Sequence, residues 1–270
     1  MLTSPAVTDQ IRFEDGAGYE RYMGQWSRLA GAAFLDWLAP ESGLRWLDVG
    51  CGNGAFTEVI VGRSAPVSVV GIDPSEAQLA FARTRPVLRL AEFRQADAMA
   101  LPFGDHTFDA AVMPLVIFFV PEPSRGVAEM ARVVCPGGLV TAYAWDMSGG
   151  GFPYTAVQAE MRSLGFAAPS PPSPGASRVE ALRELWTEAG LEAVDTHEIT
   201  VQRTFADWDD YWSTVFEGPS VGPTLAGMAS GDLAQLKVQV AGRLPADASG
   251  RISYSARANA VKGRVPPIER

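Results

Sequence analysis

The stretch LDVGCGNG at residues 47–54 carries glycines at positions 50, 52 and 54, and this spacing suggests a chemical role. Glycine lets the backbone turn tightly and approach a ligand closely. The apolar run before the glycines predicts a buried strand. The pattern after them predicts a helix, whose first N–H groups attract an anion. Such a loop predicts a nucleotide site, and Gly50, Gly52 and Ala55 also satisfy the loose dinucleotide pattern.

Three carboxylates lie near the predicted ends of successive strands. Asp48 precedes the first glycine, Asp73 lies nineteen residues beyond Gly54, and Asp97 follows the third predicted strand. Asp73 is placed to accept hydrogen bonds from a ribose diol, and a helix N-cap is its alternative role. Asp97 could accept from an exocyclic amine, or it could be an exposed loop carboxylate. Because a dinucleotide enzyme has no need of this third carboxylate, Asp97 counts against that class.

The surrounding hydrophobic patterns predict strands that alternate with helices, which implies an α/β fold with a parallel sheet of right-handed crossovers. Strands are predicted over 44–49, 67–72, 91–95, 108–113, 139–145 and 191–204, and helices over 19–38, from 75, over 127–134 and over 179–189. The run 252–261 predicts an antiparallel edge strand. We expect one domain over residues 1–270, with a cofactor-binding core at 40–146. Two substrate-cap segments are expected, 147–178 as a loop or partial cap and 206–250 as mostly helix.

Four stretches of the chain, in the expected order and spacing, resemble the class I S-adenosylmethionine-dependent methyltransferases. They are most similar to the small-molecule group that includes the ubiquinone and menaquinone methylases. The stretches are LDVGCGNGAFT, VVGIDPSEAQLAFA, FRQADAMALPFGDHTFDAAV and EMARVVCPGGLV, and they cover about residues 44–145. The resemblance implies a doubly wound, mostly parallel, seven-stranded Rossmann-like sheet with helices on both faces and the last strand antiparallel. It also implies S-adenosylmethionine as cofactor, S-adenosylhomocysteine as product, and no metal.

The resemblance also implies roles for individual residues. Asp48 and the glycine loop would surround the methionine carboxylate and amino group, Asp73 would bind both ribose hydroxyls, and Asp97 would meet the adenine amine. The segment 19–26 resembles family members in which this region folds over the cofactor, although an aromatic core face is its alternative. The predicted cofactor-binding residues are Asp48, Gly50, Cys51, Gly52, Gly54, Asp73, Pro74, Asp97, Ala98, Met113, Tyr22 and Trp26.

The sequence offers no convincing general base. Methyl transfer mainly requires that the acceptor is aligned and water is excluded, and a base is needed only if the acceptor is protonated and weakly acidic. His106 and His197 are both expected at the surface, and the segment 113–119 is wholly apolar where many relatives carry a polar residue. This favours an apolar or aromatic acceptor, or one that ionises readily. Asp146 and Tyr143 are the remaining catalytic candidates, and the predicted substrate contacts are Leu115, Phe118, Tyr154 and Trp212.

Composition narrows the class of partner. The net charge of −9 argues against nucleic acid, and the longest apolar run, 110–120, is too short to cross a bilayer. Cys51 and Cys135 lack a metal-type spacing and predict no disulfide. We therefore expect a cytoplasmic protein with a small-molecule substrate, no nucleic-acid partner and no membrane span. The edge strand near the C-terminus could pair across a homodimer, but nothing in the sequence requires one.

Alternatives to a small-molecule methyltransferase stay open at this point. A protein that binds S-adenosylmethionine without transferring the methyl group would keep the same motifs. An NAD-dependent oxidoreductase would share the glycine loop but leave Asp97 and the Pro-Gly-Gly turn at 136–138 unexplained. A methylase acting on tRNA or protein is disfavoured by the acidic charge and by the lack of an RNA-binding appendage.

Overall fold

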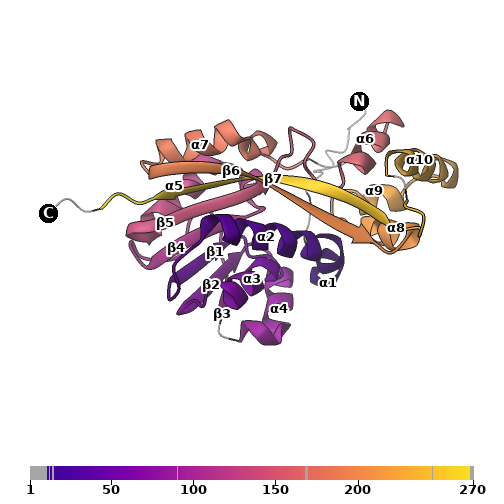
Figure 1. Cartoon of the computed structure of the whole chain (residues 1–270). Helices are drawn as coiled ribbons and strands as arrows, with labels where there is room; N and C mark the ends of the chain where they lie inside the picture. Colours follow the sequence, from indigo (N-terminus) through magenta and orange to yellow (C-terminus); the bar gives the residue numbers. More distant parts are fainter. Residues whose placement is uncertain are drawn as a thin grey trace, which may run out of the picture.

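The computed structural model describes residues 11, 13, 15–89, 91–167, 170–244 and 246–267. Within them the chain forms a seven-stranded sheet in the order β3-β2-β1-β4-β5-β7-β6 (Figure 1). The strands are β1 (Arg45–Val49), β2 (Ser68–Asp73), β3 (Ala91–Gln95), β4 (Phe108–Pro114), β5 (Val134–Trp145), β6 (Glu192–Phe205) and β7 (Ile252–Arg264). Neighbouring strands from β3 to β5 are parallel, whereas β7 runs antiparallel to both β5 and β6. The predicted fold class is confirmed.

Helices cover both faces of the sheet (Figure 1). One face carries α2 (Gln25–Leu38), α3 (Ala55–Arg63) and α4 (Glu76–Thr84), and the other carries α5 (Pro123–Val133) and α7 (Val179–Glu188). A π-helix, Glu20–Gly24, joins α1 (Gly16–Tyr19) to α2. Short 3-10 segments lie at Pro86–Leu88, Ile117–Phe119 and Pro174–Ser177. None of the helices described is long and apolar enough to cross a membrane.

Four further helices gather beyond the carboxyl ends of the parallel strands (Figure 1). They are α6 (Thr155–Ser163), α8 (Trp208–Phe216), α9 (Gly222–Ala226) and α10 (Ser230–Arg243). Strands β6 and β7 form a long antiparallel pair that extends to this group, and α8 contacts β6 while α10 contacts α6. These helices therefore lie at the carboxyl ends of the strands, which is where open α/β folds bind ligands.

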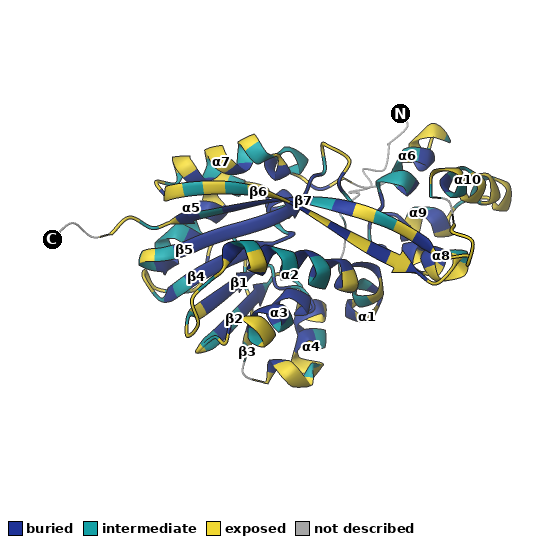
Figure 2. Ribbon diagram, viewed as in Figure 1, coloured by how far each residue is buried: buried dark blue, intermediate teal, exposed yellow. Residues whose placement is uncertain are grey.

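The core lies on the central strands because helices cover them from both sides. Strands β1 and β4 are buried along almost their whole length, and Figure 2 shows the central strands dark within a rim of exposed helix faces. Doubly covered strands need continuous apolar runs, which is why these two strands could be recognised from the sequence. The edge strand β6 instead alternates buried and exposed residues over its second half.

One expectation about the second half of the chain is wrong. Strand β7 is not at an edge: it lies between β5 and β6, and its residues Ala256, Ala258 and Ala260 are buried. Pairing across a homodimer through β7 therefore has no free strand edge to use, because both edges are hydrogen-bonded within the chain. The segment 147–178, expected as a loop or partial cap, contains α6 and a 3-10 turn.

Candidate functional site

The glycine loop follows β1 at the carboxyl edge of the sheet. The N–H groups of Gly50 and Cys51 both donate to the carbonyl of Ile72, at 2.8 and 2.9 Å, which ties the loop to β2. Gly50 has φ +75°, and a Cβ placed on it would lie 2.4 Å from a methyl carbon of Val116. Glycine is therefore required at position 50 by its backbone angle and by the close approach of the residues after β4.

Asp73, at the end of β2, is held by two backbone amides. One carboxylate oxygen accepts from the N–H of Gly52 at 3.0 Å, and the other accepts from the N–H of Ser75 at 2.8 Å. Burial raises the pKa of Asp73 to about 6, although these hydrogen bonds lower it. The N-cap of α4 is Ser75, so the alternative role proposed for Asp73, that of the helix N-cap, is taken by another residue.

A cavity of about 580 Å³ opens between the glycine loop, Asp73 and the segment after β4. This volume is within the usual range of small-molecule sites, roughly 300–1,000 Å³. Five of the predicted cofactor residues line it: Gly50, Cys51, Gly52, Asp73 and Pro74. The opposite wall is apolar and comes from Ile11, Phe13, Tyr19, Leu115, Val116 and Phe119. The cavity therefore combines polar backbone groups and a carboxylate with an apolar wall.

The other predicted cofactor residues do not line this cavity. Asp48 is fully buried behind the loop, where one oxygen accepts from the hydroxyl of Thr57 at 2.7 Å and the other has no hydrogen-bond partner among the residues that the structure describes. Desolvation raises the pKa of Asp48 to about 7. Asp97 is exposed and accepts from the N–H of Met99 at 2.8 Å. The remaining ones are Gly54, Ala98, Met113, Tyr22 and Trp26. Contact of these residues with a cofactor stays a prediction.

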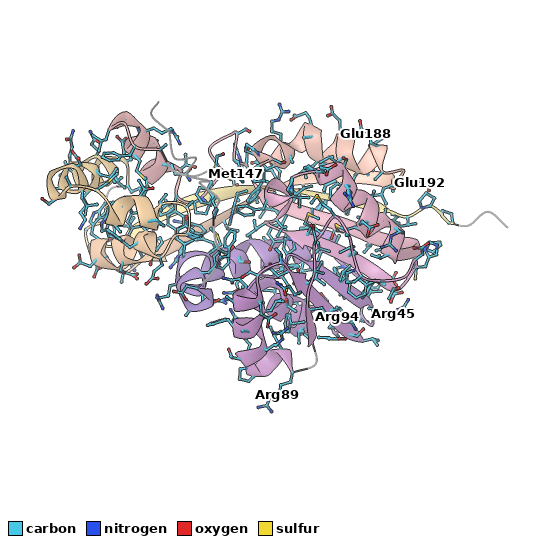
Figure 3. The ribbon with its side chains drawn as sticks, turned by 180° about the vertical axis from the view of Figure 1, so that it is seen from behind. Arg45, Arg89, Arg94, Met147, Glu188 and Glu192 are labelled. Atoms are coloured by element: carbon cyan, nitrogen blue, oxygen red, sulfur yellow. The ribbon has the colours of Figure 1, made fainter. Side chains whose placement is uncertain are left out.

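An apolar chamber adjoins the cavity and shares five lining residues with it: Ile11, Phe13, Tyr19, Leu115 and Phe119. Its other walls include Tyr22, Phe118, Trp145 and Met147, and Figure 3 shows Met147 at the end of the sheet that faces the cap helices. The chamber holds only about 40 Å³ of free space, so a ring-sized molecule would enter only if side chains moved aside. Of the predicted substrate contacts, Leu115 and Phe118 line this chamber.

The other two predicted substrate contacts have partners elsewhere. Tyr154 stacks on Tyr22 with 4.2 Å between ring centroids, and its hydroxyl donates to the carbonyl of Tyr22 at 2.7 Å. Trp212 lies on α8, where its ring packs near Phe216 and under the ammonium of Lys237. Neither residue lines the cavity or the chamber.

The two catalytic candidates are poorly suited to act as general bases. Asp146 forms an ion pair with Arg257 at 2.6 Å and also accepts from the N–H of Gly149 at 2.8 Å. Tyr143 is fully buried, and desolvation raises the pKa of its phenol well above the ordinary value, so it stays protonated at neutral pH. His106 and His197 are both exposed, as expected, and His197 stacks on Trp37.

Sequence reasoning missed several residues of the two hollows. Phe13 packs its ring edge-on against Tyr19 and Phe119, and its carbonyl accepts from the hydroxyl of Ser75 at 2.8 Å. No pattern in the sequence marks Phe13, because a single aromatic residue outside a regular element has no periodicity. Tyr19 and Phe119 lie within segments that had been singled out, so only their individual roles were missed.

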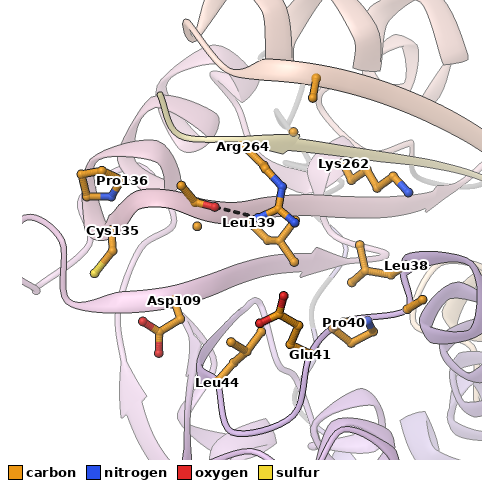
Figure 4. A pocket seen from close by; sticks show the side chains of 15 residues that line it. Leu38, Pro40, Glu41, Leu44, Asp109, Cys135, Pro136, Leu139, Lys262 and Arg264 are labelled. Carbon is orange, nitrogen blue, oxygen red and sulfur yellow. Dashed lines mark hydrogen bonds between the residues drawn. The ribbon is translucent and has the colours of Figure 1, made fainter. Parts of the chain in front are cut away.

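A separate hollow, of about 480 Å³, lies at the opposite end of the sheet from the cavity and the chamber (Figure 4). None of its lining residues belongs to the predicted site. Two of its charged groups are engaged: Asp109 pairs with Arg45 at 2.7 Å, and Arg264 donates to the carbonyl of Gly137 at 2.7 Å (Figure 4). The candidate site is therefore the cavity at the glycine loop and not this hollow.

Comparison with known proteins matches the part of the chain that contains the glycine loop and Asp73. Residues 47–142 match the sequence model of the family described as "Methyltransferase domain". The ubiquinone/menaquinone biosynthesis C-methyltransferase UbiE of Roseobacter denitrificans is 35% identical over 115 residues, which are 41% of this chain and 46% of that protein. The phosphatidylethanolamine N-methyltransferase of Cereibacter sphaeroides is 43% identical over 102 residues, 36% of this chain and 49% of that protein. The alignments thus span about half the length of these relatives.

A solved structure extends the likeness to most of the chain. The Haemonchus contortus phosphoethanolamine N-methyltransferase 2, in complex with phosphomonomethylethanolamine and S-adenosylhomocysteine, superposes with a TM-score of 0.57 and 16% identity. The match covers 95% of this chain and 61% of that one. At this identity the likeness concerns the fold alone. The names of the two relatives include one C-methyltransferase and one N-methyltransferase, so the shared core does not determine the acceptor atom.

Proposed function

The chain belongs, through its domain at residues 47–142, to the class I S-adenosylmethionine-dependent methyltransferases, and we propose that it transfers a methyl group from S-adenosylmethionine to a small, apolar or aromatic acceptor. One observation carries the proposal: the polar cavity at the glycine loop and the apolar chamber share a wall of five residues. Once the side chains around the chamber move aside to admit an acceptor, a donor in the cavity and an acceptor in the chamber would meet across this boundary.

The residues of the cavity suit this cofactor. An added Cβ on Gly52 would meet no atom within 4 Å, so the backbone there borders open space. We propose that the glycine loop and Asp48 hold the amino-acid end, and that Asp73 binds the ribose hydroxyls. Pro74, Asp97 and Ala98 would lie near the adenosine, and Met113, Tyr22 and Trp26 near the methionine side.

When bound, the cofactor supplies an electrophilic methyl group on a sulfonium. The chain's contribution is to align the acceptor and exclude water, and alignment can supply roughly 7–11 kcal/mol of the barrier. Leu115, Phe118 and Phe119 provide an apolar surface for the acceptor. Low polarity favours a step in which opposite charges neutralise each other. Because Asp146 is ion-paired and Tyr143 stays protonated, neither is available as a general base. The acceptor must therefore lose its own proton readily or carry no proton on the reacting atom.

Calorimetric titration tests the cofactor. S-adenosylmethionine and S-adenosylhomocysteine are expected to bind and NAD is not, and Asp73→Ala should lower the affinity at least about tenfold because it removes charge-assisted hydrogen bonds. Binding of NAD alone would overturn the proposal in favour of a dehydrogenase. Binding of the sulfur ligands, with no transfer of labelled methyl to any member of a panel of phenols and quinols, would favour a binding protein without transferase activity.

Two glycines provide a matched control within this titration. Gly52 and Gly43 both have a positive φ, at 52° and 79°, and an added Cβ on either meets no atom within 4 Å. Gly52→Ala and Gly43→Ala should therefore both lose roughly 1 kcal/mol of stability. Only Gly52→Ala is expected to weaken S-adenosylhomocysteine binding, since Gly52 borders the cavity and Gly43 does not.

A further inference from the structure

We infer that Glu20, Asn53 and Arg85 form a positioning network that fixes the glycine loop to the N-terminal helix, so that cofactor binding and the placement of the acceptor wall are coupled. The inference rests on the proposed function and goes beyond it, because none of the three residues belongs to the predicted cofactor or substrate contacts.

Asn53 is the anchor of the loop. It lies between Gly52 and Gly54, which have no side chains, and it is 1% exposed. Its side-chain oxygen accepts from the N–H of Ala55 at 3.2 Å, and its side-chain nitrogen donates to a carboxylate oxygen of Glu20 at 2.9 Å. The two flanking glycines have positive φ angles, at 52° and 80°. The Asn53 side chain therefore ties this part of the loop to Glu20.

Glu20, at the start of the π-helix, is the hub of the network. Besides Asn53, its carboxylate contacts the guanidinium of Arg85 and that of Arg28, the latter at 2.5 Å. A Cβ on Gly24 would lie 2.5 Å from the carboxyl group of Glu20, so the helix has a glycine where the carboxylate folds back over it. Single π-turns within helices occur frequently at functional sites.

Arg85 closes the network on the other side of the loop. Its guanidinium donates to the carbonyl of Asn53 at 2.7 Å and pairs with Glu58 of α3 at 3.0 Å. The Arg85 side chain is only 13% exposed, so solvent screens these charges less than it would on an open surface. The two arginines and two glutamates balance in charge, which lets the cluster persist near the buried loop.

The π-helix that carries Glu20 also contributes residues to the apolar chamber proposed for the acceptor. Tyr19, immediately before Glu20, lines both the cavity and the chamber, and Tyr22 and Met23, within the π-helix, line the chamber. A shift of Glu20 would therefore displace the glycine loop and the acceptor wall together. Glu20 and Arg85 are positioning residues, because neither lines the cavity. Asn53 does line the cavity, and its side chain also holds the loop to Glu20.

The test uses S-adenosylhomocysteine as the probe on the full chain. Glu20→Gln keeps the shape but removes the charge, and it should weaken binding by about tenfold. Asn53→Asp places a second carboxylate against Glu20 and should weaken it further. Asp36→Asn is the matched control, since Asp36 lies on α2 and pairs with Arg63 at 2.7 Å away from the loop; its affinity should stay within about twofold of the wild type.

Hydrogen exchange separates a positioning role from a merely structural one. In the wild type and in Asp36→Asn, S-adenosylhomocysteine should slow exchange over residues 16–24, and in Glu20→Gln this slowing should be lost while the unliganded protein still unfolds cooperatively. If Glu20→Gln fails to fold, Arg85→Gln, which removes the charged partner of Glu20 at a residue that does not line the cavity, takes its place. Wild-type affinity and protection in these variants would overturn the inference alone. A wild type that does not bind S-adenosylhomocysteine would overturn the proposed function and, with it, the inference.

Discussion

At the scale of single residues, Asp48 and Asp73 are carboxylates held in an environment that disfavours their charge. Burial raises the pKa of Asp48 to about 7 and that of Asp73 to about 6, in spite of the hydrogen bonds that each accepts. Ionised carboxylates in such places reduce stability, and strongly shifted groups in a cleft are candidates for function. Asp48, with one oxygen that has no hydrogen-bond partner in the described part of the chain, is the more costly of the two.

Asp48→Asn should therefore stabilise the protein in a pH-dependent way. The pKa of Asp48 is higher in the folded chain than in the unfolded one, so its penalty grows as the pH rises from about 4 to about 7 and then levels off. Urea unfolding should show no difference near pH 4, and at pH 8 a gain on the order of 2–4 kcal/mol for the variant. Asp73 is present in both proteins and largely cancels. An equal difference at both pH values would contradict this assignment.

At the scale of elements, the π-helix Glu20–Gly24 is held from two sides. The network of Glu20 faces the glycine loop, and on the other side the carbonyl of Tyr22 accepts from the hydroxyl of Tyr154 at 2.7 Å and from the guanidinium of Arg203 at 3.4 Å. Arg203 is 7% exposed and lies over the ring of Phe205 at 4.1 Å, so its charge is compensated by carbonyls and an aromatic face. The turn is thus positioned by buried donors and not by helix propensity.

Two tyrosine variants test whether a hydrogen bond holds the π-helix in place. Tyr154→Phe removes the donor to the π-helix and should cost about 1 kcal/mol of unfolding free energy, because the carbonyl of Tyr22 keeps only a long hydrogen bond. Tyr211→Phe should change stability little, since the buried hydroxyl of Tyr211 has no hydrogen-bond partner within the described residues. Denaturant unfolding of both variants checks this, and equal losses would show that packing, not the hydrogen bond, holds the turn.

At the scale of the whole molecule, the last strand in the chain, β7, is an interior strand of the sheet. Strand β7 pairs with β5 from Leu139↔Arg264 to Trp145↔Ala258, and with β6 from Glu192↔Arg264 to Phe205↔Ile252. The C-terminal segment therefore connects the cofactor-binding half of the sheet to the edge strand that reaches the cap helices. Its removal would expose two strand edges and the apolar surface between them.

Truncation tests this dependence. A chain that ends before Ile252 should lose cooperative unfolding and aggregate, because β5 and β6 would each lose a partner. A chain that ends after Val265, whose N–H still donates to the carbonyl of Gly138 at 3.1 Å, should unfold like the full chain. Circular dichroism on heating and light scattering distinguish these outcomes, and a stable, cooperative product of the shorter truncation would contradict a central role for β7.

Local patterns were sufficient for the elements that are buried on both faces or defined by glycine. The strand over 91–95 was predicted at its observed bounds, and those over 44–49 and 67–72 within one residue at each end. The predicted loop residues Gly50 and Gly52 and the carboxylate Asp73 come together in one cavity. These features could be predicted because continuous apolar runs and left-handed turns impose requirements on single positions. The contacts of Asp97, Met113 and Trp26 with a cofactor remain predictions.

By itself, the sequence determined the sheet class, the position of the glycine loop and the cluster of polar groups at the carboxyl ends of the strands, because each follows from short-range periodicity and backbone angles. Only the tertiary structure decided that β7 lies inside the sheet, that Phe13 walls both hollows, and that Glu20 reaches Asn53 across thirty-three residues. These are contacts between distant segments. An alternating run such as 252–261 shows which side chains share a face, but it does not show which strands will flank it.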